Sequence, residues 1–149
     1  MDAQRVSAAT ILIVEDERDI LGLLEDHLIE EGYTVLTAST GTDALVRAKS
    51  GRPDLILLDV MMPGMNGFDV CNILRDQPET RVTPIIFLTA VTETSRKIMG
   101  LKLGAADYIT KPFDLRELSA RVEVALRGRG ETGSQSVPPQ PVETADSPG

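Results

Sequence analysis

The run Leu55-Ile56-Leu57-Leu58 is continuous, apolar and of strand length, and Asp59 follows it directly. Such a run is typical of a parallel strand that is buried on both faces of a sheet. A second run, Ile11-Leu12-Ile13-Val14, is followed in the same way by Glu15 and Asp16. Ligands of open α/β sheets bind at the carboxyl ends of the strands, so the two runs predict a group of carboxylates at one edge of a sheet.

Apolar runs alternate with amphipathic stretches along the chain. The predicted strands are Thr10–Val14, Tyr33–Ala38, Asp54–Leu58, Pro84–Leu88 and Ala105–Ile109. The predicted helices are Glu17–Glu31, Thr42–Lys49, Gly67–Arg75, Thr92–Lys102 and Leu115–Leu126. Alternating strands and helices imply right-handed crossovers, and therefore an α/β fold with a parallel sheet and helices on both faces.

The composition changes near the C-terminus. From Arg129 onward Gly, Ser, Pro and Thr dominate, and no Leu, Ile, Met or aromatic residue occurs. Such a segment cannot bury enough apolar surface to offset its ordering entropy. We therefore predict one domain over residues 8–128 and a disordered tail or linker over residues 129–149.

Charge and cysteine content limit the partners and the cellular compartment that the protein can have. The net charge of -8 and the pI near 4.6 argue against direct binding of nucleic acid, which needs basic patches. The single Cys71 cannot form an internal disulfide, which favours a reducing compartment. No stretch approaches the ~20 apolar residues of a membrane helix, and the N-terminus lacks a signal layout. A cytoplasmic protein without membrane attachment is expected.

The strand ends supply the oxygen atoms that a hard divalent metal prefers. Mg²⁺ binds carboxylates, carbonyls, waters and phosphate oxygens. Asp16 and Asp59 can supply carboxylates, with Glu15 beside them. The backbone carbonyl of Met61 can supply a further oxygen. The sequence therefore predicts Mg²⁺ as a cofactor.

Asp59 can also react with phosphorus. A carboxylate can attack a phosphoryl group and form an aspartyl phosphate, and this transfer depends mainly on positioning and charge neutralisation. Lys111, after the fifth predicted strand, can pair with one phosphoryl oxygen. Thr89, after the fourth, can donate its hydroxyl hydrogen to another.

Four segments carry these residues in a characteristic order and spacing: Val14-Glu15-Asp16, Leu58 to Gly67, Leu88-Thr89-Ala90, and Gly104 to Phe113. Together they resemble the receiver domain of two-component response regulators, over roughly residues 11–127. The resemblance implies a flavodoxin-like, doubly wound fold with five parallel strands in the order 2-1-3-4-5.

The resemblance also implies roles for the site residues. Asp59 is expected to accept phosphate from the histidine of a sensor kinase or of a histidine phosphotransfer protein. Glu15 and Asp16 are expected to hold Mg²⁺. Lys111 is expected to bind the phosphoryl group, and its bond to Pro112 to be cis.

A switching surface is implied as well. Thr89 corresponds to the switch hydroxyl and Tyr108 to the aromatic switch, whose ring turns inward when Thr89 moves to the phosphate. The surface that changes comprises the helix Thr92–Lys102, the fifth strand and the helix Leu115–Leu126. A downstream effector protein or an output domain is the expected reader of this surface.

Charged residues on that surface suggest a phosphorylation-dependent homodimer. Lys97 with Glu117, and Asp107 with Arg121, match pairs that join receivers of the winged-helix transcription-factor branch, although Ala106 stands where that branch has Asp. Exposed ion pairs contribute only about 0–1 kcal/mol each to association. The alternative to a dimer interface is therefore that these residues form a solvated charged face.

Two apolar residues bear on the lifetime of the phosphorylated state. Met61 and Val91 correspond to the positions that flank the path of the attacking water in receivers, and neither can hydrogen-bond that water. The expected protein is therefore a phosphoacceptor with slow self-dephosphorylation and not an enzyme.

Other functions are weighed against this one. An aspartyl phosphatase of the haloacid-dehalogenase type carries a second Asp where this chain has Met61. A flavin carrier needs a phosphate loop that Glu15-Asp16-Glu17 would repel. Within the receiver interpretation, the chain is either a single-domain regulator or the receiver of a longer protein with a C-terminal output domain.

Some residues are assigned structural roles. Gly64 and Gly67 are expected to serve loop geometry, Cys71 to be a packed hydrophobe, and His27 to be a surface or boundary histidine.

Overall fold

The computed structural model describes residues 9–89 and 104–130. Its strands form a parallel sheet in the order β2-β1-β3-β4-β5, which confirms the predicted order 2-1-3-4-5. The strands are β1 Thr10–Val14, β2 Thr34–Ala38, β3 Leu55–Asp59, β4 Ile85–Thr89 and β5 Asp107–Thr110. The fold is therefore the doubly wound α/β architecture that the alternating pattern implies.

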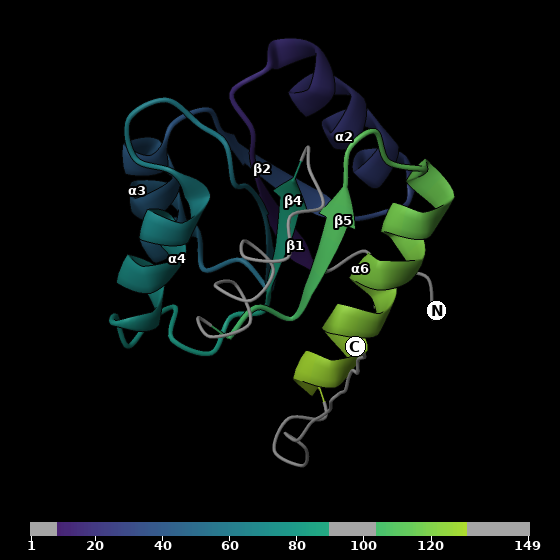
Figure 1. Ribbon diagram of the computed structural model, residues 1–149. Helices are drawn as coiled ribbons and strands as arrows, with labels where there is room; N and C mark the ends of the chain where they lie inside the picture. Colours follow the sequence, from purple (N-terminus) through teal and green to yellow (C-terminus); the bar gives the residue numbers. More distant parts are fainter. Residues whose placement is uncertain (1–8, 90–103, 131–149) are drawn as a thin grey trace, which may run out of the picture.

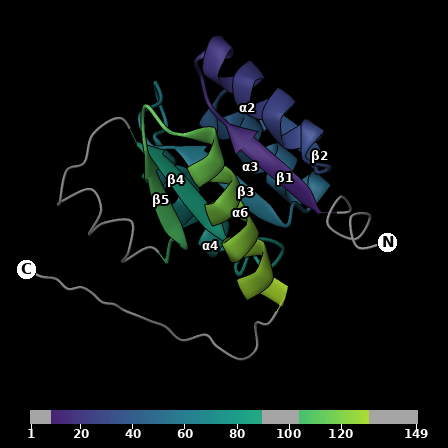
Figure 2. The same ribbon diagram turned by 90° about the vertical axis from the view of Figure 1, so that its right-hand side faces the viewer.

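Helices cover both faces of the sheet (Figures 1 and 2). The described helices are α2 Arg18–Glu30, α3 Gly41–Gly51, α4 Gly67–Arg75 and α6 Leu115–Gly130. Helices α3 and α4 pack on one face, and α2 and α6 on the other. The sheet lies between these two helical layers.

Alternation of side chains along the central strands explains this layering. Leu12, Ile56 and Phe87 point into the cluster beneath α3 and α4, whereas Ile13, Leu57 and Leu88 point into the cluster beneath α2 and α6. Every residue of β3 and β4 is buried. A central strand that packs on both faces needs apolar residues at consecutive positions, which accounts for the continuous Leu/Ile runs.

The boundaries differ from the predictions at a few positions. Asp59 is the last residue of β3 and not the first of the following loop, because its backbone remains paired with β4. Strand β5 begins and ends later than predicted, at Asp107–Thr110. Helix α6 continues to Gly130, two residues past the predicted domain boundary at 128. Residues 131–149 of the predicted tail and the predicted helix Thr92–Lys102 lie outside the described residues.

The register of the sheet aligns the functional strand ends. Val14 pairs with Leu58, Asp59 with Leu88, and Thr89 with Thr110. The residues that end or follow β1, β3, β4 and β5 therefore meet at one edge. Within the described part of the chain, no helix combines the length and apolar character that a membrane span needs.

Candidate functional site

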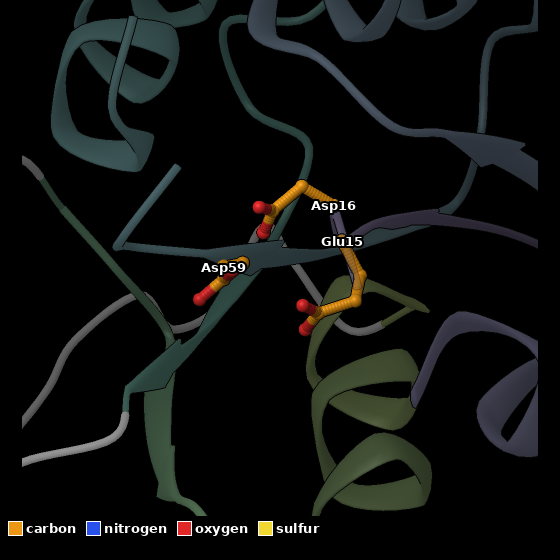
Figure 3. A group of neighbouring side chains, drawn as sticks. All are labelled: Glu15, Asp16 and Asp59. Atoms are coloured by element: carbon orange, nitrogen blue, oxygen red, sulfur yellow. The ribbon is translucent and has the colours of Figure 1, made fainter. Parts of the chain in front are cut away.

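Three carboxylates converge at the carboxyl ends of β1 and β3 (Figure 3). Glu15 and Asp16 directly follow β1, and Asp59 ends β3. One oxygen atom of each side chain lies within 4.8 Å of the others. Glu15 is fully buried and Asp59 is only 2% exposed, while Asp16 is partly accessible. The predicted acidic residues therefore do form one cluster.

Lys111 brings a positive charge into this cluster. Its Nζ atom lies 2.9 Å from Glu15 Oε1 and 3.3 Å from Asp59 Oδ1. The lysine follows β5, and its backbone N–H donates to the carbonyl oxygen of Thr89. The Lys111-Pro112 peptide bond is cis, as predicted. The ammonium thus bridges the acids of two neighbouring strands.

The cluster shifts the pKa values of its members. Burial, followed by repulsion from Glu15, raises the pKa of Asp59 from 3.8 to about 7, although Lys111 acts in the opposite direction. Burial alone would lower the pKa of Lys111, but the two carboxylates outweigh it and the net pKa lies above the ordinary value. Asp59 is therefore hard to ionise in the metal-free pocket.

The donor set fits a hard divalent cation. Glu15 Oε1 is buried, and no described residue gives it a hydrogen bond in good geometry, although the Lys111 ammonium is near. Three carboxylates cluster here and one ammonium contacts two of them, so carboxyl groups outnumber the cation. Carboxylates at this spacing are the ligands that Mg²⁺ prefers. The site is therefore chemically suited to the metal that the sequence predicts.

Met61 lies next to the reactive carboxylate. Its backbone N–H donates to Asp59 Oδ1 at 3.3 Å, a contact that the sequence did not suggest. The Met61 side chain is 50% exposed and apolar. The use of the Met61 carbonyl as a metal ligand stays a prediction.

Thr89 lies on β4, the strand next to β3, and Tyr108 lies on β5, the strand beyond it. Thr89 ends β4 and is 2% exposed. Tyr108 lies on β5 beside Phe87, with the ring centroids 5.7 Å apart, and packs against the cluster beneath α3 and α4. The aromatic ring thus lies partly inside the fold, as a packed residue would. Its switching role, like that of Thr89, is a proposal.

Gly67 lets the first turn of α4 approach β3 closely. A Cβ atom added to Gly67 would lie 2.4 Å from the backbone oxygen of Asp59, a distance that real Cβ atoms do not show. The Gly67 N–H donates to the carbonyl oxygen of Val60. Gly64, in the loop before α4, has a φ of 76°, which favours glycine. The predicted loop role is confirmed for Gly64, whereas Gly67 is the first residue of α4 and allows its close approach to the backbone of Asp59.

The charged residues of the predicted output surface are paired within one chain. Arg121 Nη1 lies 2.8 and 2.7 Å from the two carboxylate oxygens of Asp107. The same guanidinium lies 3.1 Å from Glu117. These contacts orient α6 against β5. Lys97, the predicted partner of Glu117, lies outside the described residues, as does Val91.

Comparison with known families and proteins agrees with this geometry. The family model described as the response regulator receiver domain matches residues 11–123. The alkaline phosphatase synthesis transcriptional regulatory protein PhoP of Bacillus subtilis (strain 168) is 49% identical over 126 residues, which is 85% of this chain. The match covers 51% of that protein, so the chain spans about half the length of this curated relative.

Solved structures show the same similarity. The chemotaxis protein CheY4 of Vibrio cholerae superposes with a TM-score of 0.76 at 35% identity, over 78% of this chain and 98% of CheY4. A putative response regulator from Chloroflexus aurantiacus J-10-fl gives a TM-score of 0.76 at 39% identity, over 80% of this chain and 98% of that protein. Because the family match covers most of the folded part and the relatives share its architecture, this chain belongs to the receiver domains of two-component response regulators.

Proposed function

We propose that Asp59 accepts a phosphoryl group from the phosphohistidine of a sensor kinase or of a histidine phosphotransfer protein. The observation that carries the proposal is the position of Asp59, buried at a strand end beside the Lys111 ammonium that also contacts Glu15. In the transfer, an Asp59 oxygen forms a bond to phosphorus as the phosphorus–nitrogen bond of the donor breaks. The histidine nitrogen leaves with the electron pair of that bond.

Glu15, Asp16, Asp59 and the Met61 carbonyl would hold Mg²⁺. When bound, the cation supplies positive charge that neutralises phosphoryl oxygens and favours the ionised Asp59. The chain's own contribution is positioning. The Met61 N–H orients Asp59 Oδ1, and the Lys111 ammonium lies close enough to shift from the carboxylate to an incoming phosphoryl oxygen.

Thr89 and Tyr108 connect the site to a protein surface. Thr89 ends the strand beside Asp59, and Tyr108 lies on the next strand, packed against Phe87. We propose that the Thr89 hydroxyl moves toward the phosphoryl group and that Tyr108 follows into the space it leaves. The surface of β5 and α6, which the sequence predicts to include the helix Thr92–Lys102, would then change its affinity for a downstream effector or output domain.

A phosphorylation-dependent homodimer is a second proposal about this surface. It is supported by the charges of Asp107, Glu117 and Arg121, which already form a network on β5 and α6. Dimerisation would exchange these contacts within one chain for contacts between two chains, so the net gain per pair is small. Light scattering with and without beryllofluoride tests it, and an unchanged monomer mass counts against it.

The output of the whole protein is also a proposal. The PhoP relative is a transcriptional regulatory protein, and the match covers 51% of it. A receiver that controls a C-terminal output domain is therefore one candidate. A receiver that acts by direct contact with an effector is the other. The relay mechanism at Asp59 is the same in both.

Labelling with a small-molecule phosphodonor in Mg²⁺ tests the phosphoacceptor. We expect wild type and Asp43→Asn to be labelled and Asp59→Asn to remain unlabelled. Asp43 is a suitable control because its substitution removes the same charge from a partly exposed position on α3 that is not part of the acidic cluster. Labelling that persists in Asp59→Asn would place the phosphoacceptor elsewhere.

A further inference from the structure

A polar network joins α2 to α6 on the face of the sheet that these two helices share. His27 Nε2 lies 2.7 Å from Ser119 Oγ. The Ser119 hydroxyl donates to Glu31 Oε1 at 2.8 Å, and Glu31 Oε2 lies 3.6 Å from His27 Nε2. His27 is therefore a boundary residue, as predicted. Its Nε2 atom also lies close to two possible metal ligands, the Ser119 hydroxyl and the Glu31 carboxylate.

The single hydroxyl hydrogen of Ser119 fixes which atoms of this network donate and which accept. Ser119 has one hydroxyl hydrogen, and Glu31 accepts it. His27 must therefore donate to Ser119 through an Nε2–H. If a metal ion replaces that hydrogen, His27 Nε2, the Ser119 oxygen and the Glu31 carboxylate, which lie 2.7–3.6 Å from one another, are its nearest ligands.

The distances suit a small dication. Bonds of about 2.0–2.2 Å from a tetrahedral metal to nitrogen and oxygen place neighbouring ligands about 3.3–3.6 Å apart. The separation of 3.6 Å between His27 and Glu31 meets that interval, whereas the Ser119 oxygen, at 2.7 and 2.8 Å, would move away from both as the ion enters. The ligands come from two helices, and a bound ion would fasten one to the other.

An open cleft gives the network access to solvent. Its volume is about 480 Å³, and its lining is formed by Glu31, Tyr33, Arg116, Ser119, Ala120 and Glu123. The pKa of the Tyr33 phenol is raised, first by burial and then by the negative charges of Glu123 and Glu31. These acids give that side of the cleft a negative potential, and Arg116 supplies a positive charge in the same lining. Water molecules in the cleft could fill the remaining coordination positions.

We propose that His27, Glu31 and Ser119 form a second metal site, selective for a borderline divalent transition metal such as Zn²⁺, which links α2 to α6. Imidazole nitrogen suits this class of ion, whereas the three carboxylates around Asp59 suit Mg²⁺. His27 is the single histidine of the chain, and the single cysteine, Cys71, is buried in α4. Histidine-dependent binding of Zn²⁺ can therefore be traced to one place.

Titration of the full chain with Zn²⁺ in excess Mg²⁺ tests the site. Calorimetry measures the affinity, and NMR of the His27 ring and the Ser119 amide locates the ion without any substitution. We expect both signals to shift and the melting temperature to rise, because an ion that binds only the folded state stabilises it. An absence of Zn²⁺ binding, or binding that leaves the His27 ring signals unchanged, overturns the proposal.

Matched variants separate coordination from surface charge. His27→Gln keeps a hydrogen-bond donor for Ser119 but lacks the ring nitrogen, and Glu31→Gln removes the carboxylate. We expect each to weaken Zn²⁺ binding about tenfold or more. Glu30→Gln, an exposed neighbour on α2 that loses the same charge, should bind Zn²⁺ as wild type does. Equal affinity in His27→Gln and Glu30→Gln would contradict the site.

Discussion

The ammonium of Lys111 lies 3.3 Å from the carboxylate of Asp59, in a pocket where the lysine side chain is 14% exposed and the aspartate 2%. Neither group is free to exchange this contact for bulk water. The same lysine also approaches Glu15, so one positive charge serves two buried acids. Burial, and then repulsion from Glu15, outweigh the attraction to the lysine, so the pKa of Asp59 is raised even though a cation touches it.

Removal of the lysine charge should raise the pKa of Asp59 further. In Lys111→Met, burial and the repulsion from Glu15 are no longer opposed, so we expect a pKa above the wild-type value of about 7. Carboxyl ¹³C NMR in Mg²⁺-free buffer measures this directly. Lys111→Arg, which retains the charge, should stay closer to wild type. A lower pKa in Lys111→Met would refute the assignment of Lys111 as the stabilising partner.

Replacement of Asp59 should stabilise the metal-free protein above neutral pH. The folded-state pKa of about 7 exceeds the unfolded value near 3.8, so the folded chain holds this proton more tightly. Stability linked to Asp59 is therefore complete below pH 3.8 and is lost as the pH rises through about 7. The loss has an upper bound on the order of 4 kcal/mol.

Thermal unfolding of Asp59→Asn and wild type without Mg²⁺ measures that loss. We expect the stability advantage of the variant to be largest at pH 8 and to diminish toward pH 4, because Asn carries no proton to lose. Saturating Mg²⁺ should reduce or reverse the advantage, since the metal stabilises the wild type more. A pH-independent difference between the two proteins would argue against the raised pKa.

A methyl group at Gly67 should disturb the site through the backbone of Asp59. The added Cβ would collide with the Asp59 carbonyl oxygen, which a strand cannot move cheaply. We expect Gly67→Ala to destabilise the fold by about 1–3 kcal/mol and to slow phosphorylation. Gly22→Ala is the matched control, because Gly22 lies inside α2 with open space around it. It should stabilise the fold by about 0.5–1 kcal/mol through helix propensity.

The strand order and the acidic cluster could be anticipated because they follow from local patterns. Continuous apolar runs mark β3 and β4 as central strands, and the residues after parallel strands must meet at one edge. The local pattern around each strand is therefore enough to predict that Glu15, Asp16 and Asp59 lie together. The resemblance to receivers added the roles.

Contacts between distant segments could not be anticipated in the same way. The approach of Gly67 to Asp59 depends on the angle at which α4 meets the sheet, and no residue pattern encodes that angle. The His27–Ser119 contact joins residues 92 positions apart and depends on how α2 and α6 pack. The end of α6 at Gly130 was missed because composition marks where apolar packing stops, whereas the backbone can continue one more turn as helix.

The Met61 side chain should set the lifetime of the phosphorylated state. It is 50% exposed beside Asp59 and offers no hydrogen bond to a water molecule that attacks the phosphoryl group. An asparagine there could orient that water, and positioned proton-transfer partners commonly accelerate reactions by about 10²–10⁴-fold. We expect Met61→Asn to lose phosphate at least about tenfold faster than wild type, a conservative share of that range. Val91→Glu should act in the same direction.

Decay of the aspartyl phosphate at constant Mg²⁺ measures this difference. Val82→Asn is the control, because Val82 is an exposed apolar loop residue at the entry to β4, at the opposite end of that strand from Thr89. It should decay at the wild-type rate. If Met61→Asn and Val82→Asn decay equally slowly, water access is not controlled at Met61, and the long lifetime must arise from the geometry around Asp59 and Lys111 instead.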